Sequence, residues 1–314
     1  RALACAASSL LSSGEAECSA VFDDRGRIES VGELPIAAEI SVYRAPTDND
    51  RGRGPVDYWG ISSDDLGPLG TGTGQWGVSH AQRWEMARLH LLRRTWHGSS
   101  CESGMRVLIE RWAPPAAQFG LEARWTFTPV DGKIEGAPAA AAISGNCLAV
   151  KVEMTPYGQW PERIPRAGVR LCIPGTDWTA SWVGETDIAY PDVPGVNPDG
   201  YGSGELEDLW DVGVKPQEGG HRPGLKVLEL RGEERALNII PRSEMGWSAS
   251  RWSERELAQA GHWEDLPVSD QTFVWLDAIQ DGIGTRSCGP DARPEFGARM
   301  KACTMEFILC VTDL

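Results

Sequence analysis

The sequence has no long apolar run and no excess of basic residues. No stretch approaches the roughly 20 apolar residues that a membrane-spanning helix needs. The net charge of −15 at pH 7 argues against binding to nucleic acid or to anionic membrane surfaces. It suits a neutral substrate that needs no electrostatic steering. Residues 2–11 show no cleavage pattern, so we expect no signal peptide.

Motifs for metal, phosphate and nucleotide binding are also missing. The eight cysteines include no C-x-x-C pair and no Cys/His pair at zinc-ligand spacing, so we predict no metal site. No phosphate loop is found, and strands do not alternate with helices, which excludes a doubly wound sheet and a (β/α)8 barrel. Four cysteines in strand-like segments are predicted to be small buried hydrophobes of a reduced, cytoplasmic protein: Cys147, Cys172, Cys303 and Cys310.

Turn residues and alternating apolar residues fill the chain instead. The 36 glycines and 21 prolines favour many short antiparallel strands. Apolar residues alternate from Leu148 to Met154, which predicts a strand with one buried face. Hairpins are predicted around Asp24-Arg25-Gly26, around Asp131-Gly132 and around Gly232. Late buried strands are predicted at residues 272–278 and 305–311.

Few helices and two long loops are expected. Ser253 and Glu256 form a capping box that predicts a short helix over residues 254–261. Residues 82–92 fit a helix or a strand equally well. Residues 51–80 and 184–221 read as long loops, which in a compact domain are usually functional or form an interface. Most of the 14 tryptophans are expected to pack in the core, although the indole ring also serves as a platform for sugars.

Residues 44–52, Arg-Ala-Pro-Thr-Asp-Asn-Asp-Arg-Gly, are the most informative run. Pro46 fixes its own φ, and the short polar side chains at Asp48, Asn49 and Asp50 bond the local backbone. Two arginines bracket them. We predict a rigid, partly buried loop in which Arg44 or Arg51 forms an ion pair with Asp48 or Asp50. A structural corner and a corner that faces a ligand both fit this pattern.

Three further segments follow in a fixed order. They are Tyr190-Pro191-Asp192, Pro216-Gln217-Glu218-Gly219-Gly220-His221-Arg222, and Leu276-Asp277-Ala278 with Gly282-Ile283-Gly284. With residues 44–52, these segments resemble the C-terminal small-chain domain of glycoside hydrolase family 2 β-galactosidases, from about residue 20 to residue 310. Three positions depart from the family pattern. Gly219 stands where Asn is usual, Tyr43 where Trp is common, and Cys288 where many members place a Trp that reaches the active site.

The resemblance implies an all-β antiparallel super-sandwich, similar to galactose mutarotase, over residues 19–314. Residues 1–18 would be the remnant of a linker, and a chain that begins with Arg1 is expected to be a piece of a longer protein. The family's catalytic glutamates lie on a separate barrel upstream, so no catalytic residue is assigned here. The implied partners are that barrel, the other domains of the parent and a β-galactoside. The resemblance also allows an oligomer. No cofactor is expected in this chain. For the parent enzyme, the resemblance allows Mg and Na as cofactors.

Carboxylate pairs are easy to find among 45 acidic residues and are weak evidence for catalysis. Such pairs are Glu185/Asp187, Glu205/Glu207/Asp208 and Asp48/Asp50. The resemblance points instead to a segment that would border the sugar. The predicted substrate-binding residues are Glu218, His221, Arg222, Arg286, Cys288 and Asp291. Cys288 is expected to be accessible but of ordinary reactivity, since Arg286 is the only nearby cation in the sequence.

Two other functions remain open at this point. A free-standing carbohydrate-binding module could hold a sugar on a concave face lined by Trp and Arg. A mutarotase or epimerase would need a His/Glu pair on that face, for which His221 and Glu218 are the only candidates. The same two residues fit a cluster that simply braces a loop.

Overall fold

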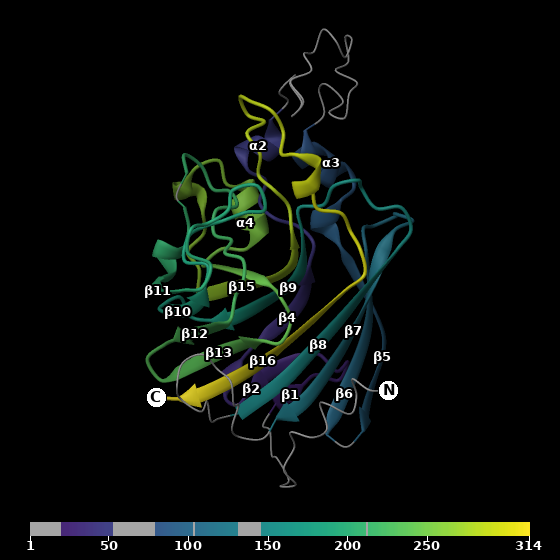
Figure 1. Ribbon diagram of the computed structural model, residues 1–314. Helices are drawn as coiled ribbons and strands as arrows, with labels where there is room; N and C mark the ends of the chain where they lie inside the picture. Colours follow the sequence, from purple (N-terminus) through teal and green to yellow (C-terminus); the bar gives the residue numbers. More distant parts are fainter. Residues whose placement is uncertain (1–19, 53–78, 103, 131–145, 212) are drawn as a thin grey trace.

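Antiparallel strands make up most of the regular structure in the described part of the chain. A computed structural model describes residues 20–52, 79–102, 104–130, 146–211 and 213–314 (Figure 1). All paired strands in these ranges run antiparallel, and they form three sheets. The all-β antiparallel fold predicted from the sequence is therefore confirmed. Residues 1–18 lie outside the described residues.

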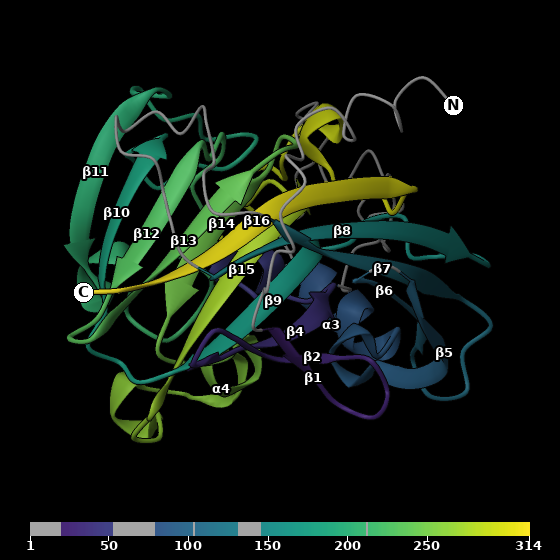
Figure 2. The same cartoon turned by 90° about the horizontal axis from the view of Figure 1, so that it is seen from below.

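The larger sheet has nine strands. In spatial order they are β11 (Gly200–Glu205), β10 (Thr179–Gly184), β12 (Val227–Arg231), β13 (Arg235–Pro241), β16 (Cys303–Asp313), β8 (Asn146–Tyr157), β7 (Gly120–Val130), β6 (Met105–Ala113) and β5 (Arg93–Glu102). Seen from below, this sheet arches over the second sheet (Figure 2). The second sheet has the order β14 (Gly246–Ser250), β15 (Gln271–Gln280), β9 (Arg166–Pro174) and β4 (Ala37–Ser41). A small third sheet joins β1 (Ala20–Phe22), β2 (Ile28–Val31) and β3 (Leu34–Pro35).

The core lies between the two large sheets, and strands such as β8 turn every second side chain toward it. On β8, Leu148, Val150, Val152 and Met154 are each at most 2% exposed, as their alternation predicts. Tryptophans fill much of the same space, and four of them are essentially inaccessible: Trp84, Trp125, Trp247 and Trp275. For these tryptophans the packing interpretation is confirmed.

The described residues also form a few short helices. They are α2 (Asp48–Arg51), α3 (His80–Met86) and α4 (Glu254–Gln259), with 3-10 turns η2 (Leu89–Leu91), η3 (Leu206–Leu209), η4 (Trp263–Asp265) and η5 (Pro294–Phe296). The helices α2, α3 and α4 all lie in the upper half of the view in Figure 1. Ser253 caps α4 as predicted. The ambiguous residues 82–92 fold as α3 and η2. In Figure 1, α2, α3 and the yellow segment before η5 gather at the top; we call this part of the molecule the loop end.

Most predicted strands are present. The hairpins β1–β2 and β12–β13 and the late strands β15 and β16 are confirmed. Residues 131–136, which were to complete the hairpin after β7, lie outside the described residues, as do residues 53–78 of the first long loop. The second long loop is interrupted, contrary to prediction, because β11 pairs with β10. This glycine-rich strand fits there since a Cβ on Gly202 would come within 2.1 Å of the Trp182 ring.

Two cysteines depart from the prediction. Cys147 on β8 and Cys310 on β16 lie directly opposite each other and form a disulfide, so the expectation that they are reduced is wrong. Strand register, which the sequence does not reveal across 163 residues, brings them together. Both are buried, as predicted. Cys172 and Cys303 are free, but they are only half-buried, so the prediction that they are buried is wrong.

Candidate functional site

The run at residues 44–52 forms a buried corner at the loop end. Thr47 is the N-cap of α2, and its hydroxyl accepts a hydrogen bond from the backbone N–H of Asp50. In return, the Asp50 carboxylate accepts a hydrogen bond from the backbone N–H of Thr47. Arg44 is 0% exposed, and its Nη2 lies 2.8 Å from Asp50 Oδ1. The predicted ion pair is confirmed, with Arg44 and Asp50 as the partners. Asp48 is exposed and pairs with Lys215.

Arg44 also ties this corner to the segment after β15. Its Nη1 donates to the carbonyl of Asp281 at 2.8 Å, and its Nη2 donates to the carbonyl of Gly282 at 3.1 Å. Burial alone would lower the pKa of Arg44, but the carboxylates of Asp50 and Asp281 outweigh it and raise the pKa above its usual value. The guanidinium is therefore a fixed charge that holds two distant parts of the chain together.

Asn49 and Asp192 hold the segment Gly282–Asp291, which we call the 282–291 loop. Asn49 Nδ2 donates to the carbonyl of Gly284 at 2.7 Å, and its Oδ1 accepts from the hydroxyl of Ser287 at 2.7 Å. Asp192 accepts from the N–H groups of Ile283 and Gly284, at 2.9 and 2.6 Å. Three motifs that are far apart in the sequence thus converge on one loop.

The far end of the loop is anchored by Asp291. Its Oδ2 accepts from His80 Nε2 at 2.6 Å, and its Oδ1 accepts from Arg163 Nη1 at 3.0 Å. Arg286 lies 3.7 Å away. Burial raises the pKa of Asp291, but the His80 bond and the charges of His80, Arg163 and Arg286 outweigh it and hold the pKa well below its usual value.

Arg163 links this anchor to the corner. Its Nε lies 3.0 Å from both carboxylate oxygens of Asp281, which is 0% exposed. Burial raises the pKa of Asp281 despite the neighbouring guanidiniums of Arg163 and Arg44. His80, Arg163 and Asp281 were not predicted from the sequence. Asp281 directly precedes the Gly-x-Gly segment, which is the only local signal for any of the three.

A second buried cluster includes Tyr190 of the Tyr190-Pro191-Asp192 motif. Arg166 Nη2 is 3.0 Å from Asp277 Oδ2 and 3.6 Å from Glu218 Oε1. The Tyr190 hydroxyl donates to Glu218 at 3.2 Å, and His221 Nδ1 is 3.1 Å from Asp277. All five side chains are nearly inaccessible. His221 and Glu218 therefore bond to different partners and brace the loops.

Arg222 is buried between two indoles. Its guanidinium lies 5.0 Å from the Trp182 ring centroid and 5.7 Å from that of Trp247, and it donates to the carbonyls of Leu209 and Gly220. Burial lowers the pKa of Arg222 to about 10, and Tyr190 offsets this only in part. Of the predicted substrate-binding residues, Glu218, His221, Arg222 and Arg286 are each at most 5% exposed, so a supporting role suits them better than direct contact.

Cys288 lies at the exposed part of the 282–291 loop, as predicted. Arg286, expected beside its thiol, is 3% exposed and points inward, with its Nη1 3.3 Å from His80 Nε2 and 3.7 Å from Asp291 Oδ2. Gly52 shows how tightly the loop packs on the corner, since a Cβ there would lie 2.3 Å from the carbonyl oxygen of Arg286. The loop therefore offers an exposed tip on a rigid base.

The carboxylate pairs suggested by the sequence have structural partners. Glu185 accepts from the N–H groups of Asp187 and Asn197, and Glu205 accepts from the Thr179 hydroxyl. Glu207 lies 3.6 Å from Arg251. Within the described ranges, no three His, Cys, Asp or Glu side chains are arranged to hold a metal ion. In the same ranges, no helix is both long and apolar enough to cross a membrane.

Comparison with known proteins identifies the family. Residues 14–309 match the family described as the β-galactosidase small chain. The chain belongs to this family. A β-galactosidase from Arthrobacter sp. (strain B7) is 31% identical over 302 residues, which cover 90% of this chain and 27% of that enzyme. A β-galactosidase from Photobacterium profundum is 23% identical over 278 residues, which cover 86% of this chain and 23% of that enzyme. The small chain thus spans about a quarter of the length of these relatives.

Solved structures similar to this small chain are more distant. A proposed aldose 1-epimerase from Escherichia coli K12 is 13% identical, with a TM-score of 0.41 over 92% of this chain and 94% of that one. The galactosidase domain of an α-galactosidase–sucrose kinase is 9% identical, with a TM-score of 0.30 over 71% of this chain and 27% of that one.

One departure of this small chain from the family pattern has a local explanation. At Gly219 a Cβ would lie 2.9 Å from the carbonyl oxygen of Asp211. The space beside Asp211 therefore favours glycine over the usual Asn.

Proposed function

We propose that this chain is the non-catalytic C-terminal part of a β-galactosidase, and that its 282–291 loop borders the sugar site of a catalytic barrel elsewhere in the parent protein. The parent would be a retaining glycosidase that hydrolyses terminal β-galactosides. Its partners would be the barrel, the other domains and the galactoside. Any requirement for Mg or Na would belong to the rest of the parent.

One observation carries the proposal. The 282–291 loop is held at its start by Asp192, in its middle by Asn49 and at its end by Asp291, while Cys288 at its tip stays exposed. A loop that only connected β15 to β16 would not need three polar clamps. Holding an exposed tip in a fixed place is what a residue that contacts substrate requires.

A mutarotase-like reaction through His221 and Glu218 has little support. The two side chains are 3% and 5% exposed and bond to Asp277 and Tyr190 respectively. A base and an acid on one sugar would both have to reach it, which these buried positions do not allow.

The test uses the full-length parent enzyme with Cys288→Trp, which restores the aromatic residue common in the family. The matched control is Cys101→Trp, at another exposed free cysteine, on β5. We expect Cys288→Trp to change KM or acceptor-sugar affinity while Cys101→Trp leaves both unchanged. Equal kinetics for the two variants would contradict the proposal. The isolated chain should show only background hydrolysis of nitrophenyl β-galactoside.

A further inference from the structure

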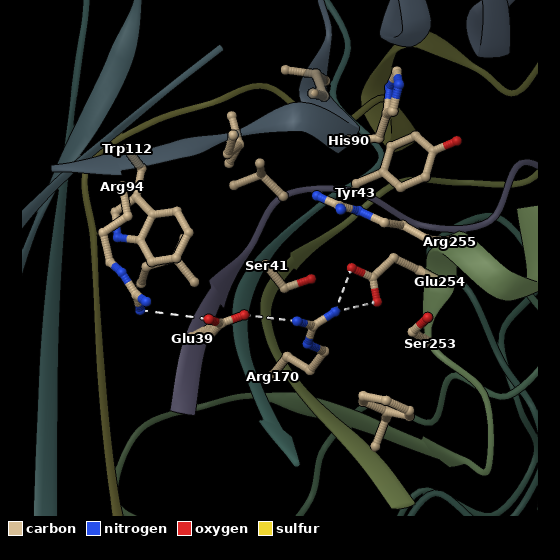
Figure 3. A pocket seen from close by; sticks show the side chains of 15 residues that line it. Glu39, Ser41, Tyr43, His90, Arg94, Trp112, Arg170, Ser253, Glu254 and Arg255 are labelled. Carbon is tan, nitrogen blue, oxygen red and sulfur yellow. Dashed lines mark hydrogen bonds and ion pairs between the residues drawn. The ribbon is translucent and has the colours of Figure 1, made fainter. Parts of the chain in front are cut away.

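A groove runs beside β4 and shares no lining residue with the loop end. One cavity, of about 530 Å³, lies between β4, α4 and the start of β5 (Figure 3). A second, of about 450 Å³, adjoins it, because Glu39 and Arg94 line both. Each is in the size range of small-molecule sites. Together they form an elongated groove rather than a single closed pocket.

A row of fixed charges crosses the groove. Arg94 lies 3.5 Å from Glu39, Glu39 lies 2.7 Å from Arg170, and Arg170 lies 2.8 Å from Glu254 (Figure 3). These side chains are between 11% and 36% exposed, so each keeps part of its surface open. Burial lowers the pKa of Arg170, but Glu254 and Glu39 outweigh it and raise the pKa. The row presents donors and acceptors in alternation, which matches hydroxyl groups because a hydroxyl both donates and accepts.

Two polar atoms on the groove lining lack a partner among the described residues. Ser41 is 5% exposed, and its hydroxyl makes no hydrogen bond within that part of the chain. The same is true of Nδ1 of His90, whose pKa is lowered by burial. Burying a polar group without a partner costs free energy. The Ser41 oxygen is itself buried, so a ligand hydroxyl would remove that cost once the Ser41 side chain turns toward the groove.

Apolar and aromatic groups share the lining with these polar groups. Phe273 and Trp112 line the cavity, with the guanidiniums of Arg170 and Arg94 stacked on them at 5.5 and 5.2 Å from the ring centroids. The Tyr43 hydroxyl, whose pKa burial raises to about 12, stays protonated. Mixed aromatic and hydrogen-bonding walls favour a ligand with both apolar faces and hydroxyls.

The charges of the lining nearly cancel. Four arginines and five acidic residues line the two cavities, and buried Glu110 lies 3.4 Å from Arg94 behind them. An anion would therefore gain no net attraction from this lining, and an uncharged ligand needs none. We propose that this groove is a binding site for a neutral saccharide of two or more sugar units, with Ser41 and the Glu39–Arg170 pair as hydrogen-bonding residues. This site goes beyond the role proposed for the 282–291 loop.

The experiment is isothermal titration of the 314-residue chain with galactose, lactose and maltotriose. Ser41→Ala removes the unpartnered hydroxyl from the groove. Ser248→Ala is the matched control, since Ser248 is 0% exposed, also lacks a partner for its hydroxyl among the described residues, and lies on β14 outside the groove. Neither change should lower the melting temperature, because each removes only an unsatisfied group.

We expect at least one of the two oligosaccharides to bind, more tightly than galactose. Ser41→Ala should weaken that binding about five- to tenfold, the loss of one hydrogen bond. Glu39→Gln should weaken it further, and Ser248→Ala should leave it unchanged. The proposal is overturned if none of the three sugars binds at millimolar concentration or if both serine variants bind equally well. If a disaccharide that contains glucuronate binds more tightly than lactose, the proposal that the ligand is a neutral saccharide is overturned.

Discussion

Replacing Arg44 by alanine should destabilise this chain far more than replacing its neighbour Asp48. Arg44 is fully buried and bonds to both carboxylate oxygens of Asp50, at 2.8 and 3.1 Å. It also satisfies the carbonyls of Asp281 and Gly282, and it lies 5.5 Å from the centroid of the Trp84 ring. The substitution leaves Asp50 charged, buried and without its cation.

The expected magnitude follows from that burial. Breaking a buried ion pair from one side typically costs about 3–5 kcal/mol, because the remaining charge is uncompensated. Asp48→Ala, in α2, removes an exposed ion pair with Lys215. Such exposed pairs contribute about 0–1 kcal/mol to stability. A double variant, Arg44→Met with Asp50→Leu, should recover part of the loss because no buried charge remains.

Urea unfolding at pH 7 measures the difference. We expect a large drop in the unfolding midpoint for Arg44→Ala and almost none for Asp48→Ala. Hydrogen exchange should also speed up in the 282–291 loop of Arg44→Ala, because the carbonyls of Asp281, just before the loop, and of Gly282, at its start, lose their bonds to Arg44. If the midpoints of Arg44→Ala and Asp48→Ala agree, the corner does not hold the loop end together.

Three further outcomes are expected. Asp192→Ala should expose the start of the 282–291 loop to limited proteolysis, since the N–H groups of Ile283 and Gly284 lose their acceptor; an unchanged cleavage pattern would count against the clamp. Because its folded-state pKa is lowered, Asp291 contributes stability that is complete above the unfolded-state value of about 3.9 and is lost as pH falls toward the lower folded value. The difference in urea midpoint between wild type and Asp291→Asn should therefore shrink below that pH. Peptide mapping without reductant should find Cys147 linked to Cys310; two free thiols there would contradict the disulfide.

Local patterns in the sequence predicted the strands and the buried corner. Alternation along β8 shows which side chains face the core, and turn residues mark the hairpins. The buried face of a strand and the position of a hairpin can therefore be recognised from about ten consecutive residues. The Arg44–Asp50 pair is also local, since six positions separate the two residues. The choice of Asp50 over Asp48 depends on the direction of the first turn of α2, where Thr47 and Asp50 cap each other.

Long-range partners could not be predicted from the sequence. His80 and Asp291 are 211 positions apart, and Arg163 and Asp281 are 118 apart, so nothing in either neighbourhood indicates the other. The cysteine pair depends on the register between β8 and β16. The four-part motif order indicated the family, but it did not show that three of the motifs meet at one loop. That convergence is visible only in the folded chain.

The central claim is that the tip of the 282–291 loop borders the sugar site of the parent enzyme. Maleimide labelling of the full-length enzyme, read at each cysteine by mass spectrometry, tests it directly. We predict that a galactoside inhibitor slows labelling of Cys288 and leaves labelling of Cys101 unchanged. Equal labelling of Cys288 with and without the inhibitor would contradict the claim.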